Sequence, residues 1–289
     1  MSLLSLIFVQ LLNALSLAAL LFLVSAGLSL IFGILRVVNF AHGVFYMVGA
    51  YLGFSTVAVT GQFWLAFLLV PPVIGILGAA LEISTLRFIY NRDASHQLLL
   101  TFGLGLVLAE GIRLLFGANS RSVDGPLFLS GSVNLFGTVY PSYRLFLGVL
   151  GIVVAFGIGL FFARTRAGLV IRAVAQNDKM ASCLGADVQL VRTLVFGASC
   201  ALAALGGIAA APLTTAYIGM GGDVIIDAFV VVVIGGLGSI IGSAAGSLVV
   251  AAAQSWGEYY IPETAMVLMY VVMAAILISR PHGLFGEKE

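Results

Sequence analysis

The sequence predicts an all-α fold, a polytopic bundle of transmembrane helices, and two observations lead to it. First, 61% of the 289 residues are hydrophobic and 9% are charged, whereas soluble domains carry about 25% charged residues. Second, residues 3–35 and 37–81 contain no Asp, Glu, Lys or Arg, and about 20 apolar residues suffice to span the hydrocarbon core as a helix. A transmembrane β-barrel would show short segments of alternating polarity, and residues 145–163 do not alternate.

Charged residues, prolines and glycines divide the apolar sequence into its expected spans. The first span has no basic residue before it and is longer than the apolar region of a signal peptide, so we expect it to be retained. A loop rich in Ser, Gly and Pro is expected at 118–143, and the longest polar stretch at 164–192. The expected spans are 8–34, 38–60, 62–82, 96–117, 144–163, 193–217 and 264–279, with a glycine-broken apolar region at 225–260.

The distribution of Lys and Arg predicts the orientation, because cytoplasmic loops carry an excess of both. The stretch 164–192 holds five basic residues and is therefore assigned to the cytoplasm. Alternation of the spans then places the N-terminus outside and three more arginines inside, namely Arg36, Arg87 and Arg92.

The basic tail, with Arg280 and Lys288, joins the cytoplasmic side only if the chain crosses twice between residues 219 and 260. The glycine-rich run 235–246 is therefore predicted to be a turn or helix break between two short segments. This gives about nine crossings, or eight plus a re-entrant hairpin. Ten of the thirteen basic residues are then cytoplasmic.

A polar segment between the first two spans is the first candidate site. Asn39 and His42 lie at the edge of an apolar stretch, where a polar side chain is costly without a partner or a water-filled cavity. Transporters often place broken helices near the membrane midplane, where they contact the substrate. The segment could line a translocation path. Alternatively, Asn39 could cap the second helix and His42 could bond a neighbouring carbonyl, and the residues alone leave both readings open.

The glycine-rich run is the second candidate. Gly238, Gly242 and Gly246 form two overlapping GxxxG steps, which allow helices to approach closely. Helix packing is the favoured interpretation, and a helix break that faces the substrate is the compatible alternative.

The polar stretch 164–192 is the third. Residues 168–176 are typical of a short helix, and Asp178 could cap a second helix that ends at Gly185. The stretch is either an ordinary solvated loop or a docking surface for a cytoplasmic partner.

Several motifs of enzymes are missing from the sequence. A P-loop requires GxxxxGK[ST], but the two lysines, Lys179 and Lys288, follow Asp and Glu. There is no HExxH or GxSxG pattern, and Cys183 and Cys200 form no CxxC pair. We therefore expect no enzyme, no metal site and no cofactor, and no ATP hydrolysis through a P-loop on this chain.

Four stretches in order along the chain resemble the permeases of branched-chain amino acid ABC transporters. They are GLSLIFG (27–33) continuing through VNFAHG (38–43) to GAY (49–51), RTRAG (164–168) with RAVAQN (172–177), GGLGSIIG (235–242), and RPHGLFG (280–286). The short N-terminus and the VNFAHG version are similar to the shorter of the two permease types that pair in this family.

The resemblance implies a single transmembrane permease domain over residues 1–289, with a cytoplasmic coupling loop at about 164–192. The expected location is the bacterial inner membrane, with the N-terminus outside and the C-terminus cytoplasmic. The implied partners are a second homologous permease subunit, two cytoplasmic ABC ATPases, a periplasmic solute-binding protein and the lipid bilayer, with no nucleic acid. An ion-coupled secondary transporter or a channel that works without an ATPase is the alternative.

The resemblance also nominates residues. The expected substrate pathway includes Asn39, His42, Gly43, Gly235 and Gly238, and the expected ATPase-coupling residues are Arg172, Ala173, Gln176, Asn177, Ala181 and Gly185. The solute stays open, because related systems also serve other amino acids, urea, amides and aromatic acids. Whether the permease pair is a homodimer or a heterodimer also stays open.

Overall fold

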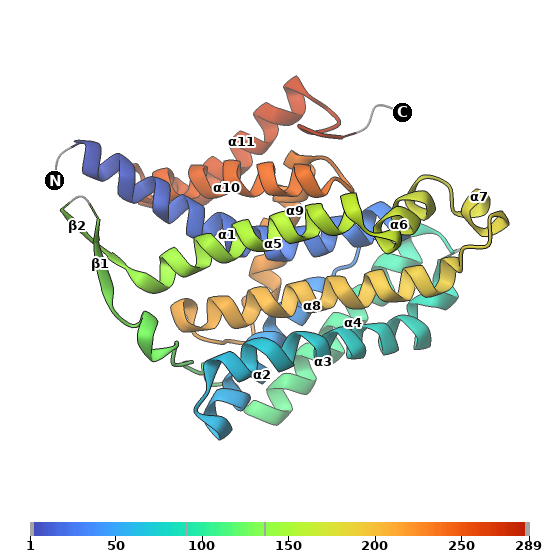
Figure 1. Cartoon of the computed structure of the whole chain (residues 1–289), viewed down its shortest axis with the longest axis horizontal. Coiled ribbons are helices and arrows are strands. Elements are labelled where there is room, and N and C mark those ends of the chain that lie inside the picture. Colours follow the sequence, from blue (N-terminus) through green and yellow to red (C-terminus); the bar gives the residue numbers. More distant parts are fainter. Residues whose placement is uncertain (1–2, 91, 136, 287–289) are drawn as a thin grey trace.

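The computed structural model describes residues 3–90, 92–135 and 137–286. Long helices lie side by side along its long axis (Figure 1). The helices are α1 Leu3–Leu35, α2 His42–Thr60, α3 Phe63–Ser84, α4 Ala94–Phe116, α5 Ser142–Arg164, α6 Arg166–Gln176, α7 Asp178–Cys183, α8 Val188–Thr214, α9 Met220–Gly235, α10 Ile240–Tyr260 and α11 Ala265–Ser279. Three 3₁₀ turns, η1 Leu86–Ile89, η2 Leu127–Leu129 and η3 Pro262–Thr264, and two strands, β1 Ser132–Leu135 and β2 Thr138–Pro141, complete the described elements.

The predicted all-α, polytopic class is confirmed. Among the described residues, seven helices are long and apolar enough to cross a membrane, namely α1, α2, α3, α4, α5, α8 and α10. Two shorter helices, α9 with 16 residues and α11 with its apolar residues 266–279, could account for the remaining segments of the eight or nine that the sequence predicts. The loop predicted at 118–143 contains a small antiparallel hairpin, in which Ser132 pairs with Pro141 and Leu135 with Thr138.

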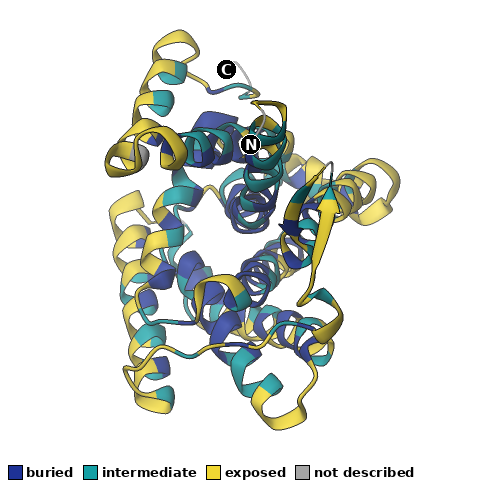
Figure 2. Cartoon of the chain, turned by 90° about the vertical axis from the view of Figure 1, so that its left-hand side faces the viewer, coloured by how far each residue is buried: buried dark blue, intermediate teal, exposed yellow. Residues whose placement is uncertain are grey.

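Helices α1 and α8 form the centre of the bundle. α1 packs against α5, α8, α9 and α10, and α8 also packs against α2 and α3. Buried residues follow these central helices, whereas the outer helices expose much of their surface (Figure 2). The exposed positions of α4 and α5 are often large and apolar, as at Leu106, Val107, Val153 and Phe156. A contiguous apolar exterior of this kind suits contact with lipid or a partner subunit.

Helices α9 and α10 form a tight hairpin around the predicted break. The chain leaves the helix at Gly236, which has φ 104°, and Gly238 has φ 81°; both values favour glycine. A Cβ added to Gly235 would overlap the Gly242 carbonyl, and one added to Gly246 would overlap the Val231 carbonyl. The prediction of a helix break is therefore confirmed, and the same glycines also allow the two helix backbones to touch.

The basic residues assigned to one side of the membrane gather at one end of the bundle. Arg36 and Arg192 line the same cavity. Thr193 follows Arg192 in α8, and its Oγ1 lies 2.8 Å from Arg87 Nη2. At the other end, Arg144 donates to Asn13 Oδ1 at 2.9 Å. Figure 1 shows the N-terminus and the hairpin at one end and α6 and α7 at the other. Lys288 lies outside the described residues.

Candidate functional site

The link between α1 and α2 is held inside the bundle. Helix α1 ends where Arg36 adopts a left-handed backbone with φ 55°, which is uncommon for a residue other than glycine. The following residues are not helical until His42. Thr101 of α4 anchors them, because its Oγ1 accepts from the Phe40 amide at 3.4 Å and donates to the Val38 carbonyl at 3.2 Å.

Asn39 and His42 have no exposed surface. Asn39 Oδ1 accepts from the Ala41 amide at 3.1 Å. His42 Nε2 lies 3.0 Å from the Val24 carbonyl of α1, so Nε2 carries the proton, because a carbonyl can only accept. Asn39 Nδ2 and His42 Nδ1 have no hydrogen-bond partner among the described residues.

The simple structural reading of these two residues holds only in part. The N-cap of α2 is Ala41, which makes no side-chain cap bond, and Asn39 instead braces the turn that precedes it. His42 does satisfy a carbonyl, but one that lies 18 residues earlier in another helix. Two buried polar atoms are left over, which is unusual in a folded core.

Glycines bring α2 into backbone contact with its neighbours. A Cβ on Gly43 would overlap the Gly221 carbonyl of α9, and one on Gly49 would lie 2.5 Å from the Ala204 carbonyl of α8. Gly238 lies against Gly33 near the end of α1, where an added Cβ would be 3.0 Å from the Gly33 Cα. The five predicted pathway residues thus fall into two groups, one at the start of α2 and one at the α9–α10 turn.

The polar stretch 164–192 contains the two predicted short helices, with different caps. Thr165 caps α6, since its Oγ1 accepts from the Gly168 amide at 2.9 Å. Asn177 caps α7, since its Oδ1 accepts from the Met180 amide at 2.9 Å. The predicted cap at Asp178 is therefore wrong by one residue, because its carboxylate accepts from Arg192 Nη2 at 2.9 Å instead. Helix α7 ends at Cys183, before Gly185, which has φ 91°.

Most of the predicted coupling residues face outward. Ala181 is buried, and the other five, Arg172, Ala173, Gln176, Asn177 and Gly185, are exposed. Large apolar side chains are exposed beside them, at Leu169, Met180 and Leu184. Because these residues lie outside the long apolar helices, lipid alone does not account for their exposure.

A cavity of about 260 Å³ separates the end of α1 from the α6–α7 corner. Its lining combines Ile34, Leu35 and Arg36 with residues 174–178 and Arg192. Residues 174–178, at the junction of α6 and α7, therefore face the end of α1 across this cavity.

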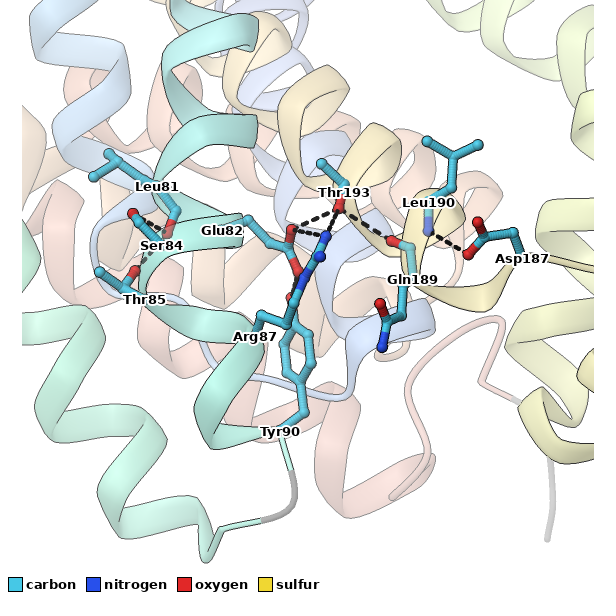
Figure 3. Close-up of polar contacts among 10 residues, drawn as sticks. All are labelled: Leu81, Glu82, Ser84, Thr85, Arg87, Tyr90, Asp187, Gln189, Leu190 and Thr193. Atoms are coloured by element: carbon cyan, nitrogen blue, oxygen red, sulfur yellow. Dashed lines mark hydrogen bonds and ion pairs between the residues drawn. The ribbon is translucent and has the colours of Figure 1, made fainter.

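Sequence reasoning missed a polar cluster beside this cavity. Glu82, at the end of α3, is fully buried and contacts Arg87, Tyr90 and Thr193 (Figure 3). Burial and the hydrogen bond to Glu82 raise the pKa of Tyr90. The local signal was an acid at the end of a span with Arg87 five residues on, but its main partner lies 111 residues away.

Comparison with known proteins gives consistent results along the chain. The family model described as "Branched-chain amino acid transport system / permease component" matches residues 10–277. The high-affinity branched-chain amino acid transport system permease protein BraD of Pseudomonas aeruginosa is 28% identical over 97% of this chain and 96% of its own. The permease protein LivH of the same kind of system in Escherichia coli K12 is also 28% identical, with the same coverage.

Among solved structures, PsaBC from Streptococcus pneumoniae in complex with Fab is 19% identical, with a TM-score of 0.49, and covers 92% of this chain and 89% of its own. The family model spans nearly all of the bundle, from α1 to α11. The chain therefore belongs to the family of branched-chain amino acid transport system permease components.

Proposed function

We propose that this chain is the membrane-spanning permease subunit of an ATP-driven ABC importer for amino acids, branched-chain amino acids foremost. The observation that carries the proposal is the family match over residues 10–277, together with relatives that are named as branched-chain amino acid permeases over 97% of the chain. The importer includes a second homologous permease subunit, two cytoplasmic ATPases and a periplasmic solute-binding protein.

ATP is hydrolysed on the separate ATPase chains, and α6 and α7 dock there. The exposed Leu169, Met180 and Leu184 support this docking role, because exposed apolar patches outside the membrane mark protein interfaces. Exposed Arg172 lies on the same segment, and arginine is enriched in interfaces. Coupling then runs from the ATPases through Arg172, Ala173, Gln176, Asn177, Ala181 and Gly185.

The chain lies in the bacterial inner membrane with its N-terminus outside and its C-terminus cytoplasmic. The gathering of Arg36, Arg87 and Arg192 at the α6–α7 end supports this orientation. The tail supports it as well, since Leu284 and Phe285 donate backbone hydrogen bonds to Ile234 and Gly235 at 2.9 Å, beside the same α9–α10 turn that contacts Gly33.

Asn39, His42, Gly43, Gly235 and Gly238 border the substrate pathway. The complete burial of Asn39 and His42, with Asn39 Nδ2 and His42 Nδ1 unpartnered among the described residues, supports this assignment, since polar and ionisable residues inside a membrane bundle mark transport paths. The close glycine contacts let α2 and α9 move past each other without side chains to disengage.

Reconstitution tests the proposal against the alternatives of ion-coupled transport and channel flux. Proteoliposomes are prepared with this chain alone and with the second permease and the ATPases, and the binding protein is added outside. We expect saturable uptake of radiolabelled leucine only when all of these proteins are present and ATP is enclosed inside the liposomes. Uptake by the chain alone under a proton or sodium gradient would indicate a secondary transporter, and unsaturable flux would indicate a channel.

A further inference from the structure

Glu82 is a buried carboxylate whose neighbours come from two distant parts of the chain. It belongs to the last turn of α3 and has no exposed surface. Thr193 Oγ1 of α8 donates to Glu82 Oε2 at 2.6 Å, and Tyr90 Oη donates to Oε1 at 2.7 Å. Arg87 Nη2 lies 3.5 Å from Oε2 and 2.8 Å from Thr193 Oγ1. Figure 3 shows the three partners converging on this carboxylate.

The cluster holds the α3–η1 corner against the start of α8. A buried charge is costly unless it is paired and hydrogen-bonded, and removing one partner of a buried pair is strongly unfavourable. Separation of this corner from Thr193 would therefore remove one hydrogen bond from the buried Glu82 and the bond between Arg87 and the Thr193 hydroxyl.

A second set of contacts continues from Tyr90 to α7. The Arg192 guanidinium lies 5.1 Å from the centre of the Tyr90 ring, within the range of a cation–π contact. Arg192 Nη2 also donates to Asp178 Oδ2 at 2.9 Å, and Asp178 is the first residue of α7. Contacts thus run without a gap from Asp178 through Arg192 and Tyr90 to Glu82.

We propose that the Glu82 cluster, with Arg192 and Asp178, is a rigid joint that makes the cytoplasmic end of α3 move together with α7. The inference rests on the proposed function, since it is an ATPase docked on α6 and α7 that would displace α7. Glu82, Tyr90 and Arg192 are then positioning residues for transport: they carry the displacement to α3, and through it to the helices packed around α8. The joint lies next to the cavity lined by Arg36 and Arg192, which leaves room for the α6–α7 corner to shift.

A purely stabilising cluster would behave differently from a joint. Loss of a stabilising cluster lowers the amount of folded complex, and ATP hydrolysis and uptake fall in the same proportion. Loss of a joint lets the docked ATPases continue to hydrolyse ATP, but the transmembrane helices no longer move with them and uptake falls. The ratio of ATP hydrolysed to solute imported separates the two cases.

The first experiment measures that ratio in the full reconstituted importer. Glu82→Gln, Thr193→Val and Tyr90→Phe each remove one element of the cluster. We expect each variant to raise the ratio of ATP hydrolysed to solute imported roughly fivefold or more, because coupling between two sites is typically worth at least a factor of about five. Thr193→Ser keeps the hydroxyl and should restore the wild-type ratio. Glu110→Gln is the matched control, because Glu110 pairs with Arg113 in an exposed position on α4, and its ratio should not change.

The second experiment follows the two segments directly. Spin labels are attached to the exposed native Cys183 of α7 and to Phe88→Cys in η1, where Phe88 is 73% exposed. A reference pair joins Cys183 to Leu127→Cys at the other end of the bundle. On ATP binding, the reference distance should change while the 183–88 distance stays constant, and adding Glu82→Gln should let the 183–88 distance change too.

The joint is overturned if the wild-type importer works but its 183–88 distance changes with ATP, or if the cluster variants reduce hydrolysis and uptake equally. It is also overturned if Glu82→Gln folds and leaves both the ratio and the distances at wild-type values. If the wild type recruits no ATPase and imports nothing with ATP, the proposed function itself fails. That outcome is distinct, because it appears before any cluster residue is changed.

Discussion

Gly49 and Gly103 are both glycines within helices, yet the same change to alanine should affect stability in opposite directions. A Cβ on Gly49 would lie 2.6 Å from the Ala204 Cα and 2.5 Å from its carbonyl oxygen. Both atoms belong to the backbone of α8 and cannot rotate away. At Gly103 of α4, an added Cβ meets no described atom within 4 Å.

The magnitudes follow from these distances. To reach ordinary contact at 3.4 Å from the Ala204 Cα, α2 and α8 would have to separate by about 0.8 Å, in an interior packed as densely as an organic crystal. Overpacking of this kind costs about 1–3 kcal/mol. Gly103→Ala should instead gain about 0.5–1 kcal/mol, because glycine is a poor helix former. Because Gly49 also lies within a helix, the gain from the better helix former is common to both variants, and they should differ by the overpacking cost, about 1–3 kcal/mol.

Thermal unfolding of the purified protein in detergent measures this difference. At about 2–4 °C per kcal/mol for chains of 150–250 residues, Gly49→Ala should lower the midpoint and Gly103→Ala should hold or raise it. Equal shifts for the two variants, or a more stable Gly49→Ala, would refute the close α2–α8 approach.

Three further predictions concern the polar segment, the docking surface and the tail. His42→Ala removes a fully buried ring and its bond to the Val24 carbonyl and should cost about 2–4 kcal/mol in thermal unfolding; an unchanged midpoint would contradict the buried placement. Leu184→Asp changes a side chain that is 83% exposed, so stability should stay constant while co-purification of the ATPase falls about tenfold, a loss of about 1.4 kcal/mol. Leu127→Asp, 92% exposed at the other end, is its control, and equal loss in both variants would argue against specific docking. Gly283→Ala should destabilise the protein more than Gly61→Ala. Both glycines have positive φ, but only at Gly283 does an added Cβ meet a backbone atom, the Gly236 nitrogen at 2.6 Å. Thermal unfolding midpoints compare the two variants, and equal midpoints would contradict the docking of the tail on α9.

Features that depend on local sequence were predictable. The spans follow from apolar length, and the break near Gly236 follows from glycine content combined with the charge of the tail. Helix boundaries were less accurate: α8 begins at Val188, five residues before the predicted span, because Asp187 Oδ1 caps it by accepting from the Leu190 amide at 3.0 Å. The hairpin at 132–141 was also missed, since strands of four residues leave little pattern in a polar loop.

Features that depend on pairing between distant residues were not predictable. Glu82 has ordinary surroundings in sequence, and its partner Thr193 becomes visible only once α3 and α8 are packed together. In the same way, the sequence marks Asn39 and His42 as unusual but does not show that Thr101 and Val24 hold this segment. The sequence of this chain is enough to predict its helices, but the pairing of polar groups depends on how those helices pack against one another.

The central claim is that ATPases docked on α6 and α7 drive import through this chain. It is tested most directly by measuring ATP hydrolysis and leucine uptake together in the complete reconstituted importer, with the wild-type chain and with Arg172→Glu. Arg172 is exposed on α6, so the change should leave the fold intact and disturb only the contact with the ATPase. The account predicts ATP-dependent uptake by the wild type and, for the variant, uptake that is lost or no longer proportional to hydrolysis. Normal, ATP-coupled import by Arg172→Glu, or wild-type uptake that proceeds equally well without the ATPases, would contradict it.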